Sequence, residues 1–419
     1  MGGLTALLLI ALTLLGAPLF TVIGAGAMLG FHREGVDLSV VAIEFFGLSE
    51  TPVLVAIPLF TFAGFLLSAG QAPRRLVQLS QALLGWFPGG LAVVSLVMCA
   101  LFTAFTGASG VTIIALGALL VPALSQAGYD ERFNLGLITS SGSLGLLFAP
   151  SLPLILYGVV AEAPIDDLFV AGVLPGVLLI VVLSAYCYWR NRRVQYMKTK
   201  LPPGATWAAI REARWDLPLP IVVLGGIYSG YFAVSEAAAV TALYVTIVEL
   251  VILRDVSWRE VPRLMRESMV LVGAILVILG VSLASTNYMI DTGVPQRLFE
   301  AVRAYVEGPT TFLLVLLIFL LILGAILDIF SATVLIVPLI LPVAGQYGID
   351  PIHLGIVFLA AMELGYLTPP VGLNLFIASH RFDKDITEIY WATQPFLLAS
   401  LLAVLVIAFW PGLSLMLLR

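Results

Sequence analysis

Apolar runs long enough to enter or cross a lipid bilayer follow one another along almost the whole chain. Only 11% of the residues are charged, against about 25% in soluble domains, so the chain cannot cover itself with a polar surface. The runs do not alternate as the strands of a membrane barrel do. The sequence therefore predicts an all-α polytopic membrane protein. A helical span needs about 20 apolar residues, and the candidate spans and half-spans are 4–31, 36–48, 52–70, 90–106, 111–127, 134–160, 167–189, 217–232, 235–253, 268–290, 311–326, 331–346, 353–379 and 392–418.

Several function classes have no support in the sequence. A net charge of −5 gives no reason to expect a nucleic-acid partner, and no phosphate-binding G-x-x-x-x-G-K-[ST] motif is present. The histidines lack metal-ligand spacing, and Cys99 and Cys187 lie in apolar runs that predict buried structural thiols. We predict that the chain is not an enzyme. A serine nucleophile at Ser109 and a channel remain the weaker alternatives.

Two basic segments predict which parts of the chain lie at the cytoplasmic surface. The segment 190–214 holds seven of the 20 basic residues, and positive charge in short loops marks the cytoplasmic side. The segment "RDVSWREVPRLMRES" (254–268) spaces its arginines as a helix would, which predicts a separate amphipathic helix at that surface. The first apolar run, 4–31, is too long for a signal peptide and is predicted to be one retained span.

One late apolar run contains residues that a helix interior does not tolerate. The stretch "GYLTPPVGLN" (365–374) holds two adjacent prolines, which remove backbone donors and clash with the preceding turn. In lipid an unpaired backbone group costs several kcal/mol, so such a break needs protein or water around it. The stretch predicts an interrupted helix.

A second break occurs at the matching place in the first half. The stretches "GASGVTIIALGALLVPALSQAGYD…SGSLGLLFAPSLPLILYG" and "LDIFSATVLIVPLILPVAGQYGID…MELGYLTPPVGLNLFIAS" share their punctuation at a constant offset of 220. The pairs are Pro122 with Pro342, Gly128 with Gly348, Asp130 with Asp350, Gly145 with Gly365, and Pro150 with Pro370. Ser109 and Thr112 match Ser331 and Thr333 after a slip of one or two residues. Helix breaks at corresponding positions of two halves indicate a transporter binding site; proline kinks that only shape packing are the alternative.

Broken helices offer two kinds of binding group. Freed backbone carbonyls can replace the hydration shell of a small cation, and helix N-termini favour an anionic substrate group. Four acids lie in apolar contexts, where an ionisable residue is a functional hypothesis. Asp328 is predicted to act near ions or substrate and Glu236 to begin a helix, whereas Glu44 and Glu363 receive no role.

Several stretches resemble the large membrane subunit of TRAP (tripartite ATP-independent periplasmic) transporters. They occur in the family's order over nearly the whole chain: "IPLFTFAGFLLSAG" (57–70), "FPGGLAVV" (87–94), "TGASGVT" (106–112), "FAPSLPLILYGVV" (148–160), "LGGIYSGYFAVSEAAAV" (224–240), "VPLILPVAGQYGIDPIHLGIV" (337–357) and "GYLTPPVGLNLFIAS" (365–379). The resemblance implies an elevator-type transporter with two inverted repeats, each with a re-entrant hairpin and an interrupted helix. The first repeat would be 1–200, with its hairpin and broken helix at about 90–160, and the second 201–419, with these elements at about 311–379.

The resemblance also implies a function and partners. It implies secondary active uptake of an organic anion, a carboxylate, with Na⁺ as coupling ion. A periplasmic substrate-binding protein would deliver the anion, and a small membrane (Q-type) subunit would complete the permease in the lipid bilayer of the bacterial cytoplasmic (inner) membrane. A partner-independent elevator-type anion/Na⁺ symporter is the alternative.

The matching motifs carry over a set of site residues. One Na⁺ site would use the first hairpin and first break, through Thr106, Gly107, Ser109, Gly145, Phe148 and Pro150. The other would use the second hairpin and second break, through Ser331, Gly365, Thr368 and Val371. The predicted substrate-binding residues are Ser109, Thr112, Ser151, Asp328, Ser331 and Asn374.

Overall fold

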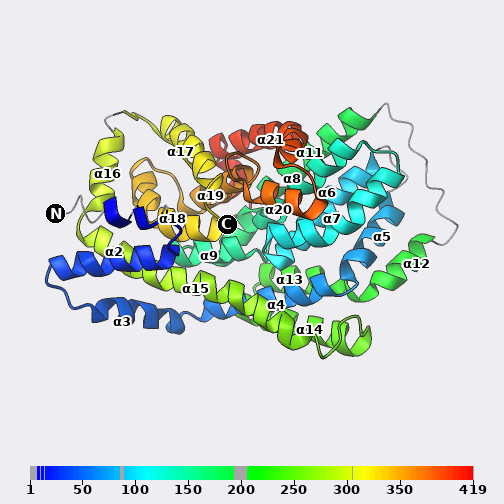
Figure 1. Cartoon of the computed structure of the whole chain (residues 1–419), viewed down its shortest axis with the longest axis horizontal. Helices are drawn as coiled ribbons and strands as arrows, with labels where there is room; N and C mark the ends of the chain where they lie inside the picture. Colours follow the sequence, from blue (N-terminus) through cyan, green and yellow to red (C-terminus); the bar gives the residue numbers. More distant parts are fainter. Residues whose placement is uncertain are drawn as a thin grey trace.

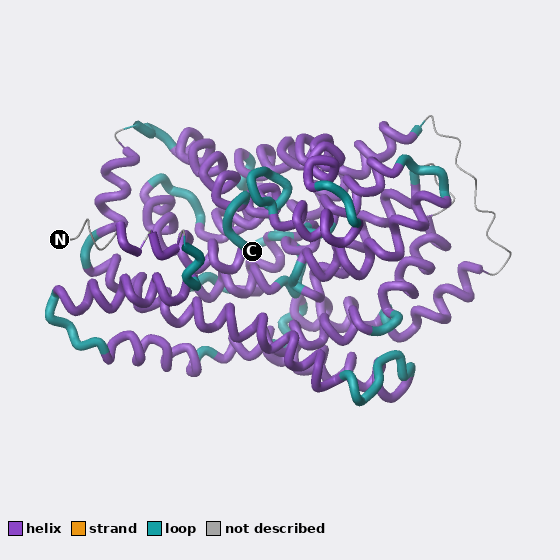
Figure 2. Tube along the Cα trace, viewed as in Figure 1, coloured by secondary structure: helices purple, strands orange, loops and turns teal. Residues whose placement is uncertain are grey.

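The structure is a computed structural model of the chain and describes residues 7–9, 11–13, 15–84, 89–192, 205–303 and 305–418. These residues form helices joined by short loops, with no strand among them (Figure 2). Seven of the described helical segments are long and apolar enough to cross a membrane, or eight if the bent pair 131–147 and 152–160 counts as one. The chain is a multi-pass membrane protein, as predicted.

The first half contains α2 (Leu19–Arg33), α3 (Ser39–Gly47), η1 (Leu48–Glu50), η2 (Pro52–Val55), α4 (Ala56–Ala69), α5 (Ala72–Leu84), α6 (Gly90–Thr106), α7 (Ser109–Gln126), α8 (Glu131–Ser141), η3 (Leu144–Leu147), α9 (Leu152–Val160), α10 (Ile165–Ala171) and α11 (Val173–Asn191). The second contains α12 (Ala205–Glu212), η4 (Ala213–Trp215), α13 (Pro218–Tyr228), α14 (Val234–Ile247), η5 (Val248–Ile252), α15 (Val261–Asp291), α16 (Val294–Arg303), α17 (Pro309–Gly324), α18 (Ile329–Gln346), α19 (Pro351–Gly365), α20 (Leu373–Phe382), α21 (Ile386–Phe409) and α22 (Gly412–Leu415).

A layer of long helices forms one side of the molecule, which we call the scaffold. The 31-residue helix α15 packs against α2, α3 and α4, and α4 packs against α14 (Figure 1). Exposed apolar side chains lie along this layer, including Ile43, Phe46 and Val270. Such side chains are the expected cover of a surface that faces lipid or another membrane chain.

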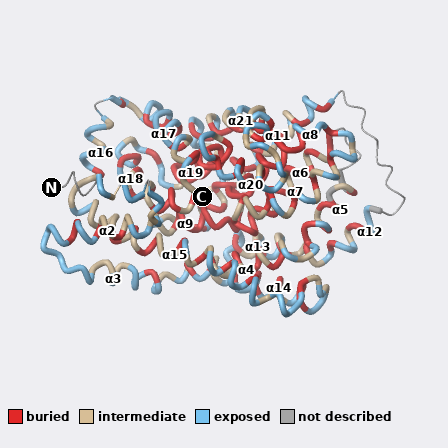
Figure 3. The backbone as a smooth tube through the Cα atoms, in the orientation of Figure 1, coloured by how far each residue is buried: buried red, intermediate tan, exposed pale blue. Residues whose placement is uncertain are grey.

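The hairpins and broken helices form the other part, which we call the core unit. Helices α6 and α7 make one hairpin, and α17 and α18 make the other. The broken helices are α8–η3–α9 and α19–α20. Buried residues gather here (Figure 3), and every residue of α19 from His353 to Gly365 is buried. A helix buried all round can hold polar or broken backbone away from lipid.

The helix bounds follow the 220-residue offset of the sequence. Helix α7 runs from Ser109 to Gln126 and α18 from Ile329 to Gln346, so both ends differ by 220 (329 − 109 and 346 − 126). Asp130 accepts one hydrogen bond from the first turn of α8, and Asp350 accepts two from the first turn of α19. A short carboxylate satisfies the free N–H groups of a helix start. The punctuation shared by the two halves therefore marks the same helix starts.

Two predictions about the scaffold were wrong. The run 4–31 is not one span, because the chain turns after Leu15 and α2 begins beyond Pro18, whose fixed φ suits a helix start. The segment 254–268 does not form a separate amphipathic helix, since α15 begins at Val261 and continues to Asp291. Leu264, Ser268, Val272 and Ile275 are buried on one face of α15, and this unbroken buried stripe extends the helix through the basic residues.

Some expected elements are shorter than predicted, and others were not predicted. The run 36–48 yields only α3, with nine residues. The search for apolar runs did not predict the charged helices α5, α12 and α16. Their polar faces lower the mean hydropathy of these segments. Residues 193–204 of the basic segment 190–214 lie outside the described part of the chain.

Candidate functional site

The tip of the first hairpin lies against the first break. Gly107 separates α6 from α7 with a positive φ of 65°, a conformation that favours glycine. A Cβ at Gly107 would lie 2.4 Å from Cγ of Leu152, and one at Gly145 would lie 2.2 Å from the carbonyl oxygen of Ala100. The two glycines therefore allow the hairpin and the break to approach closely.

The remaining residues predicted for this first ion site lie in the same region. Thr106 is buried, and its hydroxyl donates a long hydrogen bond of 3.5 Å to the carbonyl of Ala108. Phe148 is half-buried with its ring against Gly176 of α11, and Pro150 is buried. The structure thus brings the hairpin-tip residues and the break residues into one neighbourhood.

The tip of the second hairpin is bonded to the second break. The backbone N–H groups of Val371 and Gly372 both donate to the carbonyl of Ala325, at 3.2 and 3.0 Å. A Cβ at Gly365 would lie 2.5 Å from Cα of Gly324. Glycine at both positions lets α17 and α19 meet backbone to backbone. Gly365 is buried, whereas Val371 is 39% exposed.

The hydroxyl of Thr368 turns back onto its own helix. It donates to the carbonyls of Leu364 and Gly365, at 3.1 and 2.8 Å. Its oxygen lone pairs remain available, because a donating hydroxyl can still accept or bind a cation. Thr368 therefore lies just after the end of α19, at the predicted break. Its hydroxyl oxygen keeps lone pairs that a cation could use.

A buried contact joins the first hairpin to the second break. The Ser109 hydroxyl donates to Oδ1 of Asn374 at 2.7 Å, and the Asn374 amide donates to the carbonyl of Thr139 at 3.4 Å. Ser109 is 4% exposed and Asn374 is 0% exposed. The sequence predicted both as substrate-binding residues but gave no sign that they would bond across 265 positions.

The two halves interlock reciprocally. The second arm of the first hairpin, α7, packs on α20, and the second arm of the second hairpin, α18, packs on α9. Each hairpin therefore touches the broken helix of the other half as well as its own. A binding region at this centre is shared by both halves.

Three predicted substrate-binding side chains have local partners. Asp328 accepts hydrogen bonds from the N–H groups of Phe330 and Ser331, both at 3.0 Å, and so begins α18. The Ser331 hydroxyl donates to Asp328 at 2.6 Å. The hydroxyls of Thr112 and Thr103 lie 2.6 Å apart, within the first hairpin. These contacts give all three residues a structural role; the predicted ligand role stays a prediction.

Unpartnered polar atoms concentrate on the broken helices. Among the described residues, eight buried side-chain polar atoms have no hydrogen-bond partner, and five of them belong to α8, α19 or the start of α9. These five are on Asn134, Thr139, Ser140, Ser151 and Glu363. Of them the sequence predicted only Ser151; the polar run "TSSGS" (139–143) inside an apolar stretch was the available signal for two more. Buried polar groups without partners are uncommon and call for an explanation.

The oxygen atoms near the two breaks are suitable ligands for a small hard cation. Around the breaks the candidate ligands are backbone carbonyls and the hydroxyls of serine and threonine, a set that can replace an ion's water shell. Within the described ranges no group of three or more His, Cys, Asp and Glu side chains could hold a metal ion. The residues therefore fit Na⁺ and do not form a transition-metal centre.

A cavity of about 1010 Å³ lies away from these residues, between the scaffold and the core unit. Glu44 of α3 and Asn287 of α15 line its scaffold side, and Glu162 and Asp166, after α9, line the other. None of the predicted site residues lines it. The cavity marks the boundary between the two parts of the molecule rather than the predicted binding region.

Glu236 has the structural role that its sequence context indicated. Helix α14 begins after Ala233, and Oε2 of Glu236 accepts a hydrogen bond from the backbone N–H of Ala233 at 3.0 Å. A capping box has two reciprocal hydrogen bonds, and this contact is the one made by the glutamate side chain. The other is absent because alanine has no side-chain acceptor.

Comparison with known proteins gives a consistent result. The family model described as "Tripartite ATP-independent periplasmic transporter, DctM component" matches residues 6–413. The chain is 35% identical to the C4-dicarboxylate TRAP transporter large permease protein DctM of Rhodobacter capsulatus, over 97% of this chain and 96% of that protein. It is 33% identical to the isethionate TRAP transporter permease protein DctMQ of Oleidesulfovibrio alaskensis, over 93% of this chain and 60% of that protein.

One solved structure shares the fold at low identity. The YdaH transporter of Alcanivorax borkumensis, described as having an unusual topology, superimposes with a TM-score of 0.58 and 14% sequence identity, over 89% of this chain and 88% of that one.

Proposed function

The chain belongs to the DctM component family of tripartite ATP-independent periplasmic transporters, as a large permease subunit for organic-acid uptake, and we propose that it couples this uptake to Na⁺. We further propose that its substrate is a carboxylate that a periplasmic substrate-binding protein delivers. The Ser109–Asn374 contact between the first hairpin and the second break carries the proposal, because it places polar groups of both halves at one buried centre.

The chain's own groups supply what anion and cation binding require. The N-terminal ends of α7 and α20, which begin beside Ser109 and Asn374, direct N–H groups and a positive dipole end toward the centre. The C-terminal end of α19, with Thr368, offers oxygens to a cation. When bound, Na⁺ supplies positive charge that stabilises an anion nearby. Favourable binding of both together is the thermodynamic basis of coupling.

We propose that the core unit moves against the scaffold in an elevator motion. Hydrogen bonds at Ala325, Asn374 and Thr139 connect the hairpins to the broken helices. These connections support the proposal that the core unit moves as one rigid body. The cavity of about 1010 Å³ lies between the core unit and the scaffold. It supports the proposal that the scaffold is a separate part against which the core unit moves. Packed units that slide or rotate about an interface are an established form of conformational change.

The proposed partners follow from the family and from one relative's name. We propose a small Q-type membrane subunit, and a relative named as a DctMQ permease supports this pairing. The exposed apolar side chains of α2, α3 and α15 give such a subunit a surface within the membrane. The proposed location is the bacterial cytoplasmic membrane.

Reconstitution tests the proposal. The chain is placed in proteoliposomes alone, with the small subunit, and with both the small subunit and the substrate-loaded binding protein, under an inward Na⁺ gradient. We expect carboxylate uptake only in the complete system, and loss of uptake when K⁺ replaces Na⁺ at equal ionic strength. Uptake of free substrate by the lone chain would instead establish the partner-independent symporter.

A further inference from the structure

Glu363 is a buried acid for which the described residues supply no hydrogen-bond or ion-pair partner. It lies in the last turn of α19, is 3% exposed, and its Oε1 has no hydrogen-bond partner. None of the ion pairs formed by the described residues includes it. A carboxylate in such a place is strongly unfavourable unless it gains a proton or a cation.

Its position in the helix adds to this cost. The C-terminal end of a helix carries a partial negative charge, which disfavours an acid and favours a cation. Glu363 stands two residues before the end of α19 at Gly365. A cation bound at this end would satisfy the helix terminus and the carboxylate together.

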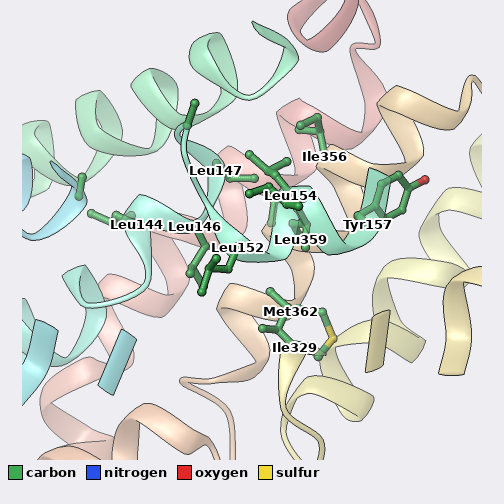
Figure 4. Close-up of a cluster of buried hydrophobic side chains, with 14 of the residues drawn as sticks. Leu144, Leu146, Leu147, Leu152, Leu154, Tyr157, Ile329, Ile356, Leu359 and Met362 are labelled. Carbon is green, nitrogen blue, oxygen red and sulfur yellow. The ribbon is translucent and has the colours of Figure 1, made fainter. Parts of the chain in front are cut away.

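The face of α19 that carries Glu363 points into the core unit. Ile356 and Leu359 lie in the apolar cluster with Leu147 and Leu154 of the first broken helix (Figure 4). Glu363 follows Leu359 by four residues and Ile356 by seven, so it shares their face one turn nearer the second break. By this periodicity the acid lies near the end of α19, on the helix face that packs on the first broken helix.

The other acids of these elements already have partners. Asp328 accepts hydrogen bonds at the start of α18, and Asp350 does so at the start of α19. The oxygens predicted for the second ion site are carbonyls and hydroxyls, which carry no formal charge. The unpartnered carboxylate is thus the group left to neutralise a buried monovalent cation.

We propose that Glu363 is the anionic group of a monovalent-cation site at the C-terminal end of α19. The Glu363 carboxylate neutralises the charge of the cation. The carbonyls near Gly365 and the Thr368 hydroxyl complete the cation's ligand shell. This assignment rests on the proposed Na⁺ coupling and names the charged residue of that site. The rival account is a permanently neutral acid that only fills space in the core unit.

The substitution Glu363→Gln separates the two accounts, because glutamine copies the neutral acid in size and shape. The thermal unfolding midpoint of the purified permease complex is measured over a range of NaCl, with choline chloride holding the ionic strength constant. Na⁺ should raise the wild-type midpoint by mass action. We expect Glu363→Gln to need at least tenfold more Na⁺ for the same rise, while its midpoint in choline alone is not lowered.

Glu249→Gln is the matched control. Glu249 is also fully buried with one unpartnered oxygen, but it lies in the scaffold and bonds to Arg75. Its substitution should change the baseline midpoint and leave the Na⁺ concentration dependence as in the wild type. Glu363→Met, a neutral apolar side chain of similar length, serves if Glu363→Gln does not fold, and should likewise need more Na⁺ for the same rise, since the predicted first ion site is left intact.

The outcomes are distinct. An Na⁺ concentration dependence equal to that of the wild type in Glu363→Gln, or in Glu363→Met if Glu363→Gln does not fold, would overturn the assignment while Na⁺ coupling stands. If the wild-type complex itself shows no stabilisation by Na⁺ over choline, the proposed coupling fails and the assignment fails with it.

Discussion

At the scale of single residues, Thr368 separates the backbone and side-chain contributions to ion binding. Thr368→Ala keeps the carbonyl oxygen and removes only the hydroxyl that turns back on α19. If this hydroxyl is a ligand, its loss should cost about 1–3 kcal/mol of Na⁺ binding. We expect a higher half-saturating Na⁺ concentration for uptake by the complete system, at unchanged expression.

Thr241→Ala is the control for this substitution. The Thr241 hydroxyl also donates to a carbonyl one turn earlier, at 2.7 Å, but it lies in the scaffold helix α14. Its removal should leave the Na⁺ titration of uptake unchanged. Equal behaviour of the two variants would mean that the Thr368 hydroxyl serves only its own helix.

Ser109 and Asn374 should behave as one unit. Removing either side chain leaves the other buried without its 2.7 Å partner, which costs about 1–3 kcal/mol. We expect the single alanine variants and the double variant to lower the unfolding midpoint and the uptake rate by similar amounts. A double-mutant cycle on the purified complex measures this coupling; additive effects would show that the contact is incidental.

At the scale of elements, the closeness of α17 and α19 depends on a glycine pair. A methyl group at Gly365 would meet Gly324 backbone at 2.5 Å, so Gly365→Ala should separate the second hairpin from the second break. We expect strongly reduced uptake and a weaker Na⁺ response. Gly345→Ala is the control, because this glycine lies in α18 of the same hairpin with open space around it. It should leave uptake and the Na⁺ response unchanged.

Helix α5 is fastened to the scaffold by a buried ion cluster. Arg75 bonds to Asp216 at 2.6 Å, to Glu249 at 3.1 Å, and to Asp255. These acids come from three segments: the end of η4, η5, and the loop before α15. One arginine thus fixes the relative positions of elements that lie more than 140 residues from it in the chain.

Loss of this arginine should destabilise the permease. Arg75→Ala leaves buried carboxylates without their counter-charge, a change that costs about 3–5 kcal/mol in buried pairs. We expect a large fall in the unfolding midpoint of the purified complex. Arg74→Ala, at the adjacent exposed position, should change the midpoint little. Equal midpoints for the two variants would contradict an anchoring role.

At the scale of the whole molecule, the Arg75 cluster indicates which loops lie on the same side of the membrane. It joins Asp216, which follows α12, to Asp255, which precedes α15, so both segments lie on one side. Helix α15 has 31 residues, about 46 Å at 1.5 Å per residue, enough to carry the chain to the other side. Since the basic segment 190–214 is predicted to be cytoplasmic, the end of α16 is predicted to be periplasmic.

Cysteine labelling checks this topology. Trp207 in α12 and Tyr305 after α16 are 72% and 88% exposed. A membrane-impermeant thiol reagent added outside sealed cells should label Tyr305→Cys and not Trp207→Cys. The native Cys99 and Cys187 are both fully buried, so they should add little background. The reverse labelling pattern would invert the orientation.

Features that depend on local composition could be predicted from the sequence. The first hairpin arm was predicted at 90–106 and found as Gly90–Thr106, and the second hairpin's arms were predicted within two residues of their observed bounds. Both breaks lie where proline and glycine interrupt apolar runs. Hydropathy, helix propensity and the missing N–H of proline act within a few residues, so these features can be read without knowing the fold.

Only the tertiary structure decided which of these residues meet. The bond between Ser109 and Asn374, the Arg75 cluster and the unpartnered state of Glu363 depend on how distant helices pack. Asp328, predicted as a ligand because an acid in an apolar run is unusual, also caps the start of α18, and its ligand role stays a prediction. A sequence pattern fixes which side chains a helix presents on each face. The partner that each face finds depends on contacts summed over the whole molecule, which no local window contains.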